Sequence, residues 1–465
     1  MQAQNVQQFI DNHPFSPLQK RLLVLCFLVV AIDGFDTASI GFIAPALRGE
    51  WHLSAAALAP LFGAGLFGLM AGALLLGPLA DRHGRKPVLL LSVAFFGLTS
   101  LLSSFAPDMT TLLVLRFLTG LGLGGAMPTT ITLTSEYCPQ ARRASLVTLM
   151  FCGFTIGSAL GGLVAAQLLA SVGWRGILMI GGVLPLLLVP VLLFALPESL
   201  RWMVLRGRDG SAIAAKIAGG IAGDAKSVPP LTVSDVKLPG SPVSQLFRPG
   251  LIGGTLLLWT TFFMSLLIIY LLSSWLPTIL NGAGHSLSQA SFISSAFQIG
   301  GTAGAIMLGR WMDRYRPHRV LALAYGCAAL CIGAVGIVTD NVPLLVLAVF
   351  GVGFGVSGSQ VGANALAAAF YPTTSRATGV SWASAIGRSG SVLGSMVGGA
   401  LLAAELSNQA IFLMLAVPAV LAAFALLAMG RLQGRAEVAA APATAAPTAA
   451  AETAPLMPLQ PTTNN

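Results

Sequence analysis

Long apolar runs separated by short polar breaks dominate this chain. A helix of about 20 apolar residues matches the hydrocarbon thickness of a bilayer. A lipid interior cannot solvate free backbone groups, so a spanning run of this kind must be helical. Charged residues make up only 9% of the chain, against about 25% in soluble proteins, so a soluble fold is excluded. The runs predict twelve spanning helices, at 22–47, 56–80, 88–106, 111–135, 144–169, 174–196, 251–276, 289–312, 319–338, 343–369, 377–403 and 409–430.

The twelve runs fall into two sets of six, divided by the longest polar break. This break, 197–250, holds six prolines and many charges, and it predicts a central cytoplasmic loop. We expect an all-α membrane protein with one six-helix bundle at 1–196 and a second at 251–430. The tail at 431–465 is rich in Ala, Pro and Thr and is expected to be a disordered cytoplasmic segment.

Lysine and arginine are distributed unevenly about the spans, and their distribution predicts the orientation of the chain. With both termini in the cytoplasm, 21 of the 25 Lys and Arg residues lie in inner segments, as the positive-inside rule requires. The formal charge of +9 is therefore a signal of topology. It does not indicate a nucleic-acid partner.

Two sequence motifs recur at nearly the same offset. "GPLADRHGRK" begins at Gly77 and "GRWMDRYRPHR" at Gly309, an offset of 232, and in both Asp stands four residues after Gly and is followed by Arg. "GSALGG" from Gly157 matches "GSVLGS" from Gly390 at an offset of 233. Matches in the same order indicate a duplicated six-helix unit. Parallel repeats are one architecture of secondary transporters, whose site lies between the halves near the midplane.

The first of these motifs resembles the loop after the second helix in the major facilitator superfamily, and the resemblance covers nearly the whole chain. It implies the fold of that superfamily, which has two pseudo-symmetric bundles of six transmembrane helices. It also implies that Gly77 permits close helix packing and that Asp81 forms a charge latch with the basic residues beside it. Conformational gating is implied for Gly77, Asp81, Arg82, Gly84, Arg85, Asp313, Arg314 and Arg376.

Apart from Arg175, Arg310 and Arg319 at the ends of their spans, four charged residues lie inside the predicted spans: Asp33, Asp36, Arg116 and Arg388. Each costs about 2.5–3.5 kcal/mol at the bilayer centre, so such residues usually face a cavity or one another and serve function. At about 1.5 Å of rise per residue, Asp36 and Arg116 lie about 9 Å and about 8 Å from the outer edge of the core. These matching depths suit an ion pair, whereas Asp33 and Arg388 lie nearer the midplane.

Two interpretations of Asp33 and Asp36 stay open. The pairing with Arg116 could be structural and lock two helices together. Alternatively the carboxyl groups bind protons, because a low dielectric favours the neutral form of a carboxyl group and a neighbouring Arg favours the charged form. An acid whose Arg partner can be taken away would then act as a proton switch.

The stretches "DGFDTASIGF" from Asp33, "RFLTGLGLGGAMP" from Arg116 and "IGRSG" from Ile386 resemble one branch of the superfamily, the aromatic acid:proton symporters. The resemblance implies import of 4-hydroxybenzoate, protocatechuate, benzoate or a related acid, with protons, across the bacterial inner membrane. It implies a monomer in the lipid bilayer, with no cofactor and no metal. Proton coupling is implied for Asp33, Asp36, Arg116 and Glu136.

Arg388 is the candidate cation for the substrate carboxylate, and aromatic side chains are the candidate walls for its ring. A benzoate-like anion entering against a negative-inside potential is opposed by about 2.3 kcal/mol per 100 mV, which one co-transported proton cancels. Glycines of the fourth span, such as Gly120 and Gly124, are expected to serve close helix packing instead of ligand binding. The candidate substrate contacts are Arg388, Trp382, Tyr270, Phe263, Gln360 and Asn364, the last two for a ring hydroxyl.

Three rival functions are weighed against this one. A symporter of another organic anion, such as a dicarboxylate of the muconate type, is not excluded by the sequence. A drug-efflux antiporter is disfavoured because the fifth span has Ser158 and no proline where such antiporters often carry a Gly-Pro kink. A membrane enzyme is disfavoured because no histidine lies within a predicted span to serve as a base or metal ligand.

Overall fold

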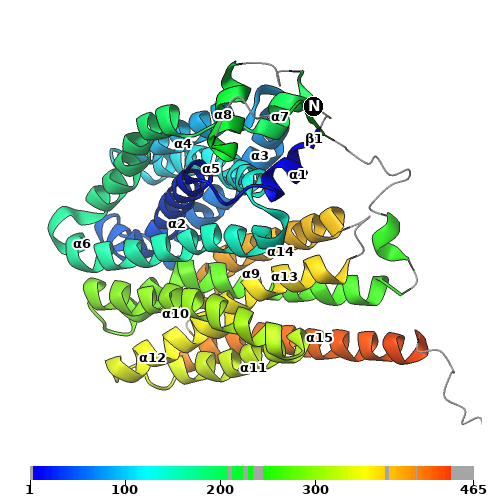
Figure 1. Ribbon diagram of the computed structural model, residues 1–465. Coiled ribbons are helices and arrows are strands. Elements are labelled where there is room, and N and C mark those ends of the chain that lie inside the picture. The colour runs from blue at the N-terminus through cyan, green and yellow to red at the C-terminus, as the bar shows by residue number, and fades with distance from the viewer. Residues whose placement is uncertain are drawn as a thin grey trace, which may run out of the picture.

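The computed structural model describes residues 4–207, 212–223, 229–233, 244–248, 250–371, 376–404 and 406–440. Its long helices lie side by side in two groups (Figure 1). The long helices are α2 (Pro17–Glu50), α3 (Ala55–His83), α4 (Arg85–Ser103), α5 (Met109–Tyr137), α6 (Arg143–Ala195), α9 (Ile252–Gly282), α10 (Leu287–Arg314), α11 (Pro317–Val335), α12 (Val342–Val352), α13 (Gly358–Phe370), α14 (Arg376–Ala403) and α15 (Asn408–Ala440). The short elements are β1 (Gln4–Asn5), α1 (Val6–Asp11), η1 (Gln140–Arg142), α7 (Leu200–Leu205), α8 (Ala212–Ala222), β2 (Leu231–Thr232), η3 (Ser244–Phe247) and η4 (Gly353–Ser357).

The helices account for all twelve predicted spans. Ten helices in the described part are long and apolar enough to cross a membrane, with α12, the π-turn η4 and α13 forming one of them. Another, α6, contains two spans, because Gly173 at φ 67° and ψ −179° breaks the helix between them. Helix α14, which carries Arg388, is outside the ten but runs for 28 residues along α9. The all-α membrane fold is therefore confirmed.

The helices pack as two bundles that share an interface. In the N-terminal half α2 packs along α6 and α3 along α5, and in the C-terminal half α9 packs along α14 and α11 along α15. Between the halves, α6 packs on α10, α3 on α14 and α2 on α9. Figure 1 shows the N-terminus, α7 and the far end of α15 toward one end of the molecule, which we call the terminal end.

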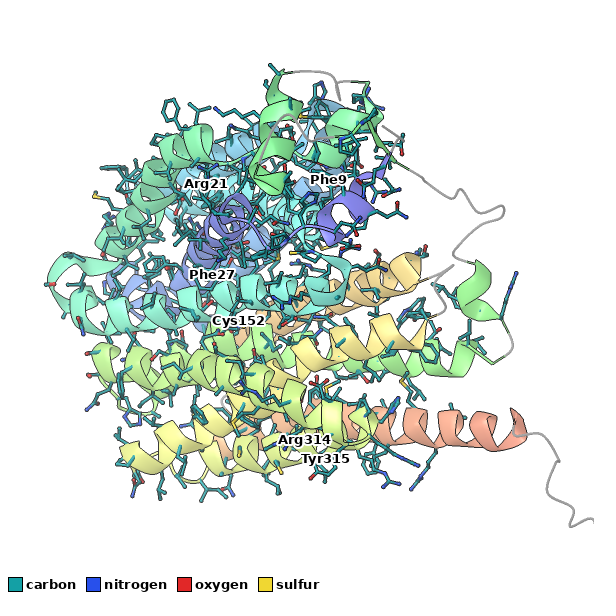
Figure 2. All side chains as sticks on the ribbon, in the orientation of Figure 1. Phe9, Arg21, Phe27, Cys152, Arg314 and Tyr315 are labelled. Carbon is teal, nitrogen blue, oxygen red and sulfur yellow. The ribbon has the colours of Figure 1, made fainter. Side chains whose placement is uncertain are left out.

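Large apolar side chains project from the outside of both bundles (Figure 2). Phe194, Leu330 and Leu74 are 86%, 76% and 75% exposed. Water would oppose such exposure, whereas lipid tails are as apolar as these side chains. These faces are therefore the lipid-facing surfaces of a multi-pass membrane protein.

Glycines let α3 and α5 approach each other closely. A Cβ atom at Gly120 would lie 2.0 Å from the carbonyl oxygen of Gly65, and one at Gly124 would lie 2.2 Å from that of Leu69. This confirms that the glycine run of α5 serves helix packing. The corresponding expectation for Gly77 is wrong in this structure, because a Cβ there would meet no atom within 4 Å. At that point α3 stands clear of its neighbours.

The terminal end carries regular structure where the sequence predicted loops. Helix α7 buries Trp202 and Met203, and β1 pairs in parallel with β2 of the central segment. Helix α15 continues to Ala440, into the tail predicted to be disordered. These elements are short or polar, so a search for apolar runs of spanning length does not find them. Residues 441–465 of the predicted tail lie outside the described part.

Gly120→Val should destabilise the protein, because the new side chain would overlap the backbone of α3. Overpacking of this kind costs about 1–3 kcal/mol. Thermal unfolding of the purified protein measures the loss. Gly77→Ala on α3 is the matched control, and its unfolding temperature should stay unchanged or rise, since Ala favours a helix over Gly by up to about 1 kcal/mol. Equal losses in both variants would contradict the packing role of Gly120.

Candidate functional site

Asp36 and Arg116 form an ion pair inside the N-terminal half. The Nη1 atom of Arg116 lies 3.2 Å from Oδ2 of Asp36, and its Nη2 atom lies 3.5 Å from Oδ1. The hydroxyl of Ser100 on α4 also donates a hydrogen bond to Asp36, and Arg116 donates one to Thr119 over 3.3 Å. The pair therefore joins α2, α4 and α5, and it forms between the two residues whose depths matched in the sequence.

The ion pair is buried, and its geometry decides whether burial is tolerated. The side chains of Arg116 and Asp36 are 5% and 2% exposed. Removing two charges from water costs several kcal/mol for each ion, which their attraction offsets only if the geometry is good and hydrogen bonds satisfy the remaining atoms. Both carboxylate oxygens of Asp36 accept hydrogen bonds here. Asp36 is thus both ion-paired and hydrogen-bonded at each of its carboxylate oxygens.

Asp33, one helical turn before Asp36 on α2, is bound much less completely. Its side chain is buried, and Oδ1 accepts a hydrogen bond of 3.1 Å from the hydroxyl of Thr37. Its other oxygen, Oδ2, has no hydrogen-bond partner among the described residues. A buried carboxylate with an unpaired oxygen is costly, and binding a proton removes its charge. Asp33 is therefore the less completely satisfied of the two acids.

Arg388 on α14 brings a positive charge from the C-terminal half to this region. It interacts electrostatically with Asp33 on α2 and with Tyr270 on α9. Its Nη2 atom lies 3.7 Å from the sulfur of Met127 on α5, and a thioether is a weak acceptor. A planar guanidinium with so weak a partner retains the capacity to bind a carboxylate at two points.

A cavity of about 50 Å³ lies beside the ion pair, between the halves. Tyr270 and Ser274 of α9 line it, opposite Asp36 and Arg116. A cavity of about 150 Å³ holds a benzene ring, so this cavity has room for water but not for an aromatic acid. Binding of an aromatic ring here requires a wider arrangement of the two halves.

The predicted aromatic walls of the substrate site are not gathered at this cavity. Trp382 is 40% exposed and stacks on Trp259, with the ring centroids 5.9 Å apart. Phe263 is partly buried, and its backbone packs against Gly390. Of the three predicted aromatic contacts, Tyr270 lines the cavity.

The two predicted amide contacts differ in burial. Gln360 on α13 is buried, and its Oε1 atom has no hydrogen-bond partner among the described residues. Asn364, one turn later, is exposed. A buried amide oxygen without a hydrogen-bond partner favours a polar ligand. The geometry of Gln360 therefore supports its predicted contact with a ring hydroxyl of the substrate, whereas the geometry of Asn364 gives no such support.

The predicted charge latch is present in the loop after α3. The Nη2 atom of Arg85 lies 3.0 Å from a carboxylate oxygen of Asp81 and 3.4 Å from one of Glu136. The Asp81 side chain is 74% exposed and that of Glu136 is 9% exposed, so water screens the first pair much more than the second. Arg82 is exposed. Glu136, expected among the proton-coupling residues, thus lies in the latch, about 30 Å along α5 from Arg116.

Glu198 organises this latch and was missed by the sequence analysis. Its Oε1 atom accepts hydrogen bonds from the backbone N–H groups of Arg85 (2.9 Å), Lys86 (3.2 Å) and Ser199 (2.7 Å). Gly84 has φ 108°, and a Cβ there would lie 2.3 Å from the Glu198 carboxylate. Glu198 therefore caps α4, whose free N–H groups and helix dipole favour a negative charge. The available signal was an acid at the start of the predicted central loop.

The second copy of the loop motif forms no such latch. Arg314 is exposed at the end of α10 (Figure 2), as is Asp313. Neither takes part in an ion pair within the described residues. The offset of 232 places Pro317 at the position of Arg85. Arg376 begins α14, and its side chain lies outside the described part.

Two further residues of the site were also missed. Ser100 is a single hydroxyl in an apolar run, and Met127 has the composition of an ordinary packing residue. A signal for Ser100 did exist, because buried Ser92, Thr99 and Ser103 share its side of α4. Such a polar stripe inside a membrane indicates a helix that faces a polar partner.

Arg116→Gln should strongly destabilise the protein, because it leaves Asp36 buried without its cation. Breaking one partner of a buried pair costs about 3–5 kcal/mol. The double variant Asp36→Asn/Arg116→Gln should lose less than the sum of the two single losses, as measured by thermal unfolding. Arg48→Gln at the exposed end of α2 is the control and should change stability by less than about 0.5 kcal/mol. Additive losses would show that the pair does not act as a unit.

Comparison of the chain with known proteins shows its family. A model of the Major Facilitator Superfamily matches residues 26–339 and 282–460. A gallate transporter of Pseudomonas putida is 47% identical, covering 93% of this chain and 96% of the relative. The 4-hydroxybenzoate transporter PcaK of Pseudomonas aeruginosa is 46% identical, covering 92% of this chain and 96% of the relative. The benzoate transport protein of Acinetobacter baylyi is 32% identical, covering 90% and 91%.

A solved structure supports the fold. The crystal structure of a D-xylose-proton symporter is similar with a TM-score of 0.68, at 19% identity, covering 88% of this chain and 97% of that chain. At this identity the likeness concerns the fold alone. The family model and the relatives together cover most of the chain. The chain therefore belongs to the Major Facilitator Superfamily and is a multi-pass membrane transporter, not an enzyme.

Proposed function

We propose that this transporter imports a small aromatic carboxylate together with protons across the bacterial inner membrane, by alternating access. The observation that carries the proposal is the position of Arg388, which brings a guanidinium from one half toward the acid Asp33 of the other. The relatives named for gallate, 4-hydroxybenzoate and benzoate indicate the cargo class, since all three are small aromatic carboxylates.

Arg388 is the proposed carboxylate-binding residue. Its contact with the Met127 sulfur is weak, and a carboxylate that accepts two parallel hydrogen bonds would replace it at a gain in energy. Tyr270 lines the adjoining cavity and offers both a flat ring face and a hydroxyl. An aromatic acid held by its carboxylate at Arg388 would therefore place its ring beside Tyr270 once the cavity widens.

The two acids of α2 are proposed to differ in role. Asp36 pairs with Arg116 of the same half, so the pair moves as one unit when the halves rotate. The cation near Asp33 belongs to the other half, and rotation of the halves changes its distance. When a substrate carboxylate occupies Arg388, Asp33 loses the benefit of that charge and takes a proton to stay buried. This exchange couples proton binding to substrate binding.

The proposed orientation places the terminal end in the cytoplasm. The halves touch mainly at the middle and at the opposite end: Thr155 shares a hydrogen bond with Thr302, and Ser288 donates one to the carbonyl oxygen of Ala166. A Cβ at Gly41 would lie 2.1 Å from the carbonyl oxygen of Ser273. With cytoplasmic termini, the contacts of Ser288 and Gly41 lie toward the outer side of the membrane.

Uptake by membrane vesicles tests the proposal. With an imposed gradient, acid outside, labelled gallate, 4-hydroxybenzoate or benzoate should accumulate, and a protonophore should abolish accumulation. Asp33→Asn should lose uphill uptake yet retain exchange of internal for external substrate, because a neutral amide cannot cycle a proton. Asp340→Asn in the exposed turn after α11 is the control. Accumulation of a dicarboxylate in place of these acids, or normal uptake by Asp33→Asn, would overturn the proposal.

Arg388→Lys should keep the charge but weaken binding of the acid. A Lys lacks the planar fork of Arg, and losing a charge-assisted bond costs about 1.5–3 kcal/mol, or about 10- to 150-fold in affinity. Binding to the purified protein measures this, with Arg319→Lys on the surface as control. Arg388→Lys should reduce the affinity for the amide of the same acid less than it reduces the affinity for the acid. Equal losses for acid and amide would remove Arg388 from the substrate site.

A further inference from the structure

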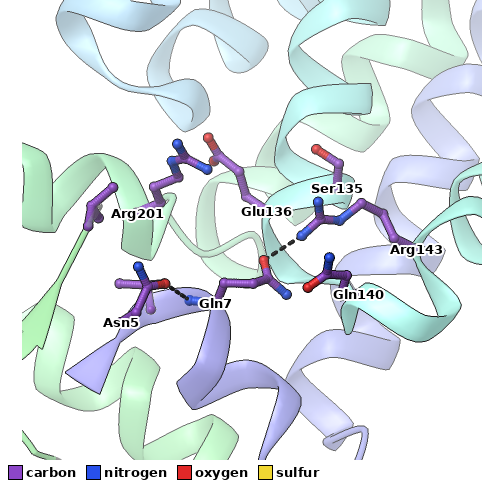
Figure 3. Close-up of a pocket in the computed structure, with 9 residues that line it drawn as sticks. Asn5, Gln7, Ser135, Glu136, Gln140, Arg143 and Arg201 are labelled. Carbon is purple, nitrogen blue, oxygen red and sulfur yellow. Dashed lines mark hydrogen bonds between the residues drawn. The ribbon is translucent and has the colours of Figure 1, made fainter. Parts of the chain in front are cut away.

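A polar cavity of about 270 Å³ lies at the terminal end of the N-terminal half (Figure 3). Its volume is just below the roughly 300–1,000 Å³ of pockets for drug-sized ligands, so it suits a ligand with a single ring. Three segments distant in sequence enclose it: the N-terminal segment, the turn between α5 and α6, and the central segment. Its lining residues are Asn5, Val6, Gln7, Ser135, Glu136, Gln140, Arg143, Arg201 and Val233.

The walls of this cavity carry charges of both signs. Arg143 and Arg201 supply positive charge from two different segments, and Glu136 supplies one negative charge (Figure 3). Glu136 interacts with Arg85, which lies 3.4 Å away outside the cavity, and with Arg201 of the lining. The lining holds two arginines and one acid, so the cavity keeps a net positive charge for an anion, while Glu136 and the neighbouring hydroxyl of Ser135 offer acceptors for a ligand hydroxyl.

The cavity is held open by hydrogen bonds among its walls. Arg143 donates to Oε1 of Gln7 (Figure 3), and Gln7 donates to Asp11 over 3.0 Å and to the carbonyl oxygen of Cys138 over 3.4 Å. Asp11 accepts the backbone N–H of Gln140 over 2.7 Å. A site that is ordered before its ligand arrives loses less entropy on binding.

We propose that this cavity is a second, regulatory binding site for a hydroxylated aromatic monocarboxylate, a proposal that rests on the proposed function. The proposed topology places it in the cytoplasm, where the imported acid is released. Its carboxylate would lie between Arg143 and Arg201, and its hydroxyl would donate to Glu136. A phosphate dianion suits the cavity less, because Glu136 repels a second negative charge more strongly.

Occupancy of this site is coupled to the charge latch through one shared residue. Glu136 forms a wall of the cavity and also pairs with Arg85, which binds Asp81 in the loop after α3. Because coupling between two sites is reciprocal, a ligand that changes the field at Glu136 changes the latch, and the latch changes the affinity of the ligand. The cytoplasmic concentration of the imported acid would thereby influence the loop after α3.

Titration of purified full-length protein with 4-hydroxybenzoate tests the site. Wild type should show two binding sites, and Arg388→Gln should retain the one at the terminal end. Adding Arg201→Gln to Arg388→Gln should weaken that remaining site about tenfold or more, because a charge-assisted bond is lost. Ser135→Phe, which fills the cavity and removes no charge, should weaken it as well. Arg142→Gln, at an exposed residue beside Arg143 and outside the lining, should leave it unchanged.

The outcomes separate this proposal from the proposed function. A single site that Arg388→Gln abolishes overturns the regulatory site and leaves the transport proposal standing. A single site that survives Arg388→Gln and is lost in Ser135→Phe supports the regulatory site and contradicts the role of Arg388. Tighter binding of inorganic phosphate than of 4-hydroxybenzoate would overturn the assignment to a monocarboxylate.

The coupling to the latch has its own test. Arg85 does not itself line the cavity, but Arg85→Gln removes the cation that lies 3.4 Å from the lining residue Glu136 and should weaken 4-hydroxybenzoate binding in the Arg388→Gln background. Asp81→Asn is the matched variant on the exposed side of the latch and should have a smaller effect, since water screens its pair with Arg85. Unchanged affinity in Arg85→Gln would overturn the coupling.

Discussion

The buried ion pair of Asp36 and Arg116 is the interaction on which the N-terminal half depends. Apolar helices in lipid gain little from hydrophobic association, because lipid tails are as apolar as the side chains. A buried charge, in contrast, costs several kcal/mol unless it is paired. Together with Ser100, the pair fixes the depth and rotation of α2, α4 and α5. The glycines of α5 then allow the close approach that this arrangement requires.

The two acids of α2 differ in which half of the molecule supplies the neighbouring cation. A proton-binding group in an alternating transporter must experience different fields in the two states. The cation of Asp36 belongs to the same half, whereas the charge of Arg388 reaches Asp33 from the opposite half. Under the proposed function, a separation of one helical turn would therefore divide a structural role for Asp36 from a coupling role for Asp33.

The parts of this structure that could be predicted depend on local composition or on helix rise alone. Apolar run length located the spans, and rise per residue matched the depths of Asp36 and Arg116. The walls of the site could not be predicted, because whether Trp382 faces the cavity depends on the rotation of α14, which packing sets. Glu198 was missed because its partners lie distant in sequence. The close packing expected at Gly77 was wrong because the end of α3 stands clear of its neighbours.

The two repeats have diverged most where the gating charges lie. Pro317 stands where the first repeat has Arg85, and Ala369, at the offset of 233, stands where it has Glu136. The second copy therefore keeps Asp313 but lacks both partners of a buried latch. Within the described residues the latch forms in the first half, and the N-terminal and central segments dock against that same half. Among the described residues, the ion pairs at the terminal end therefore lie within the N-terminal bundle.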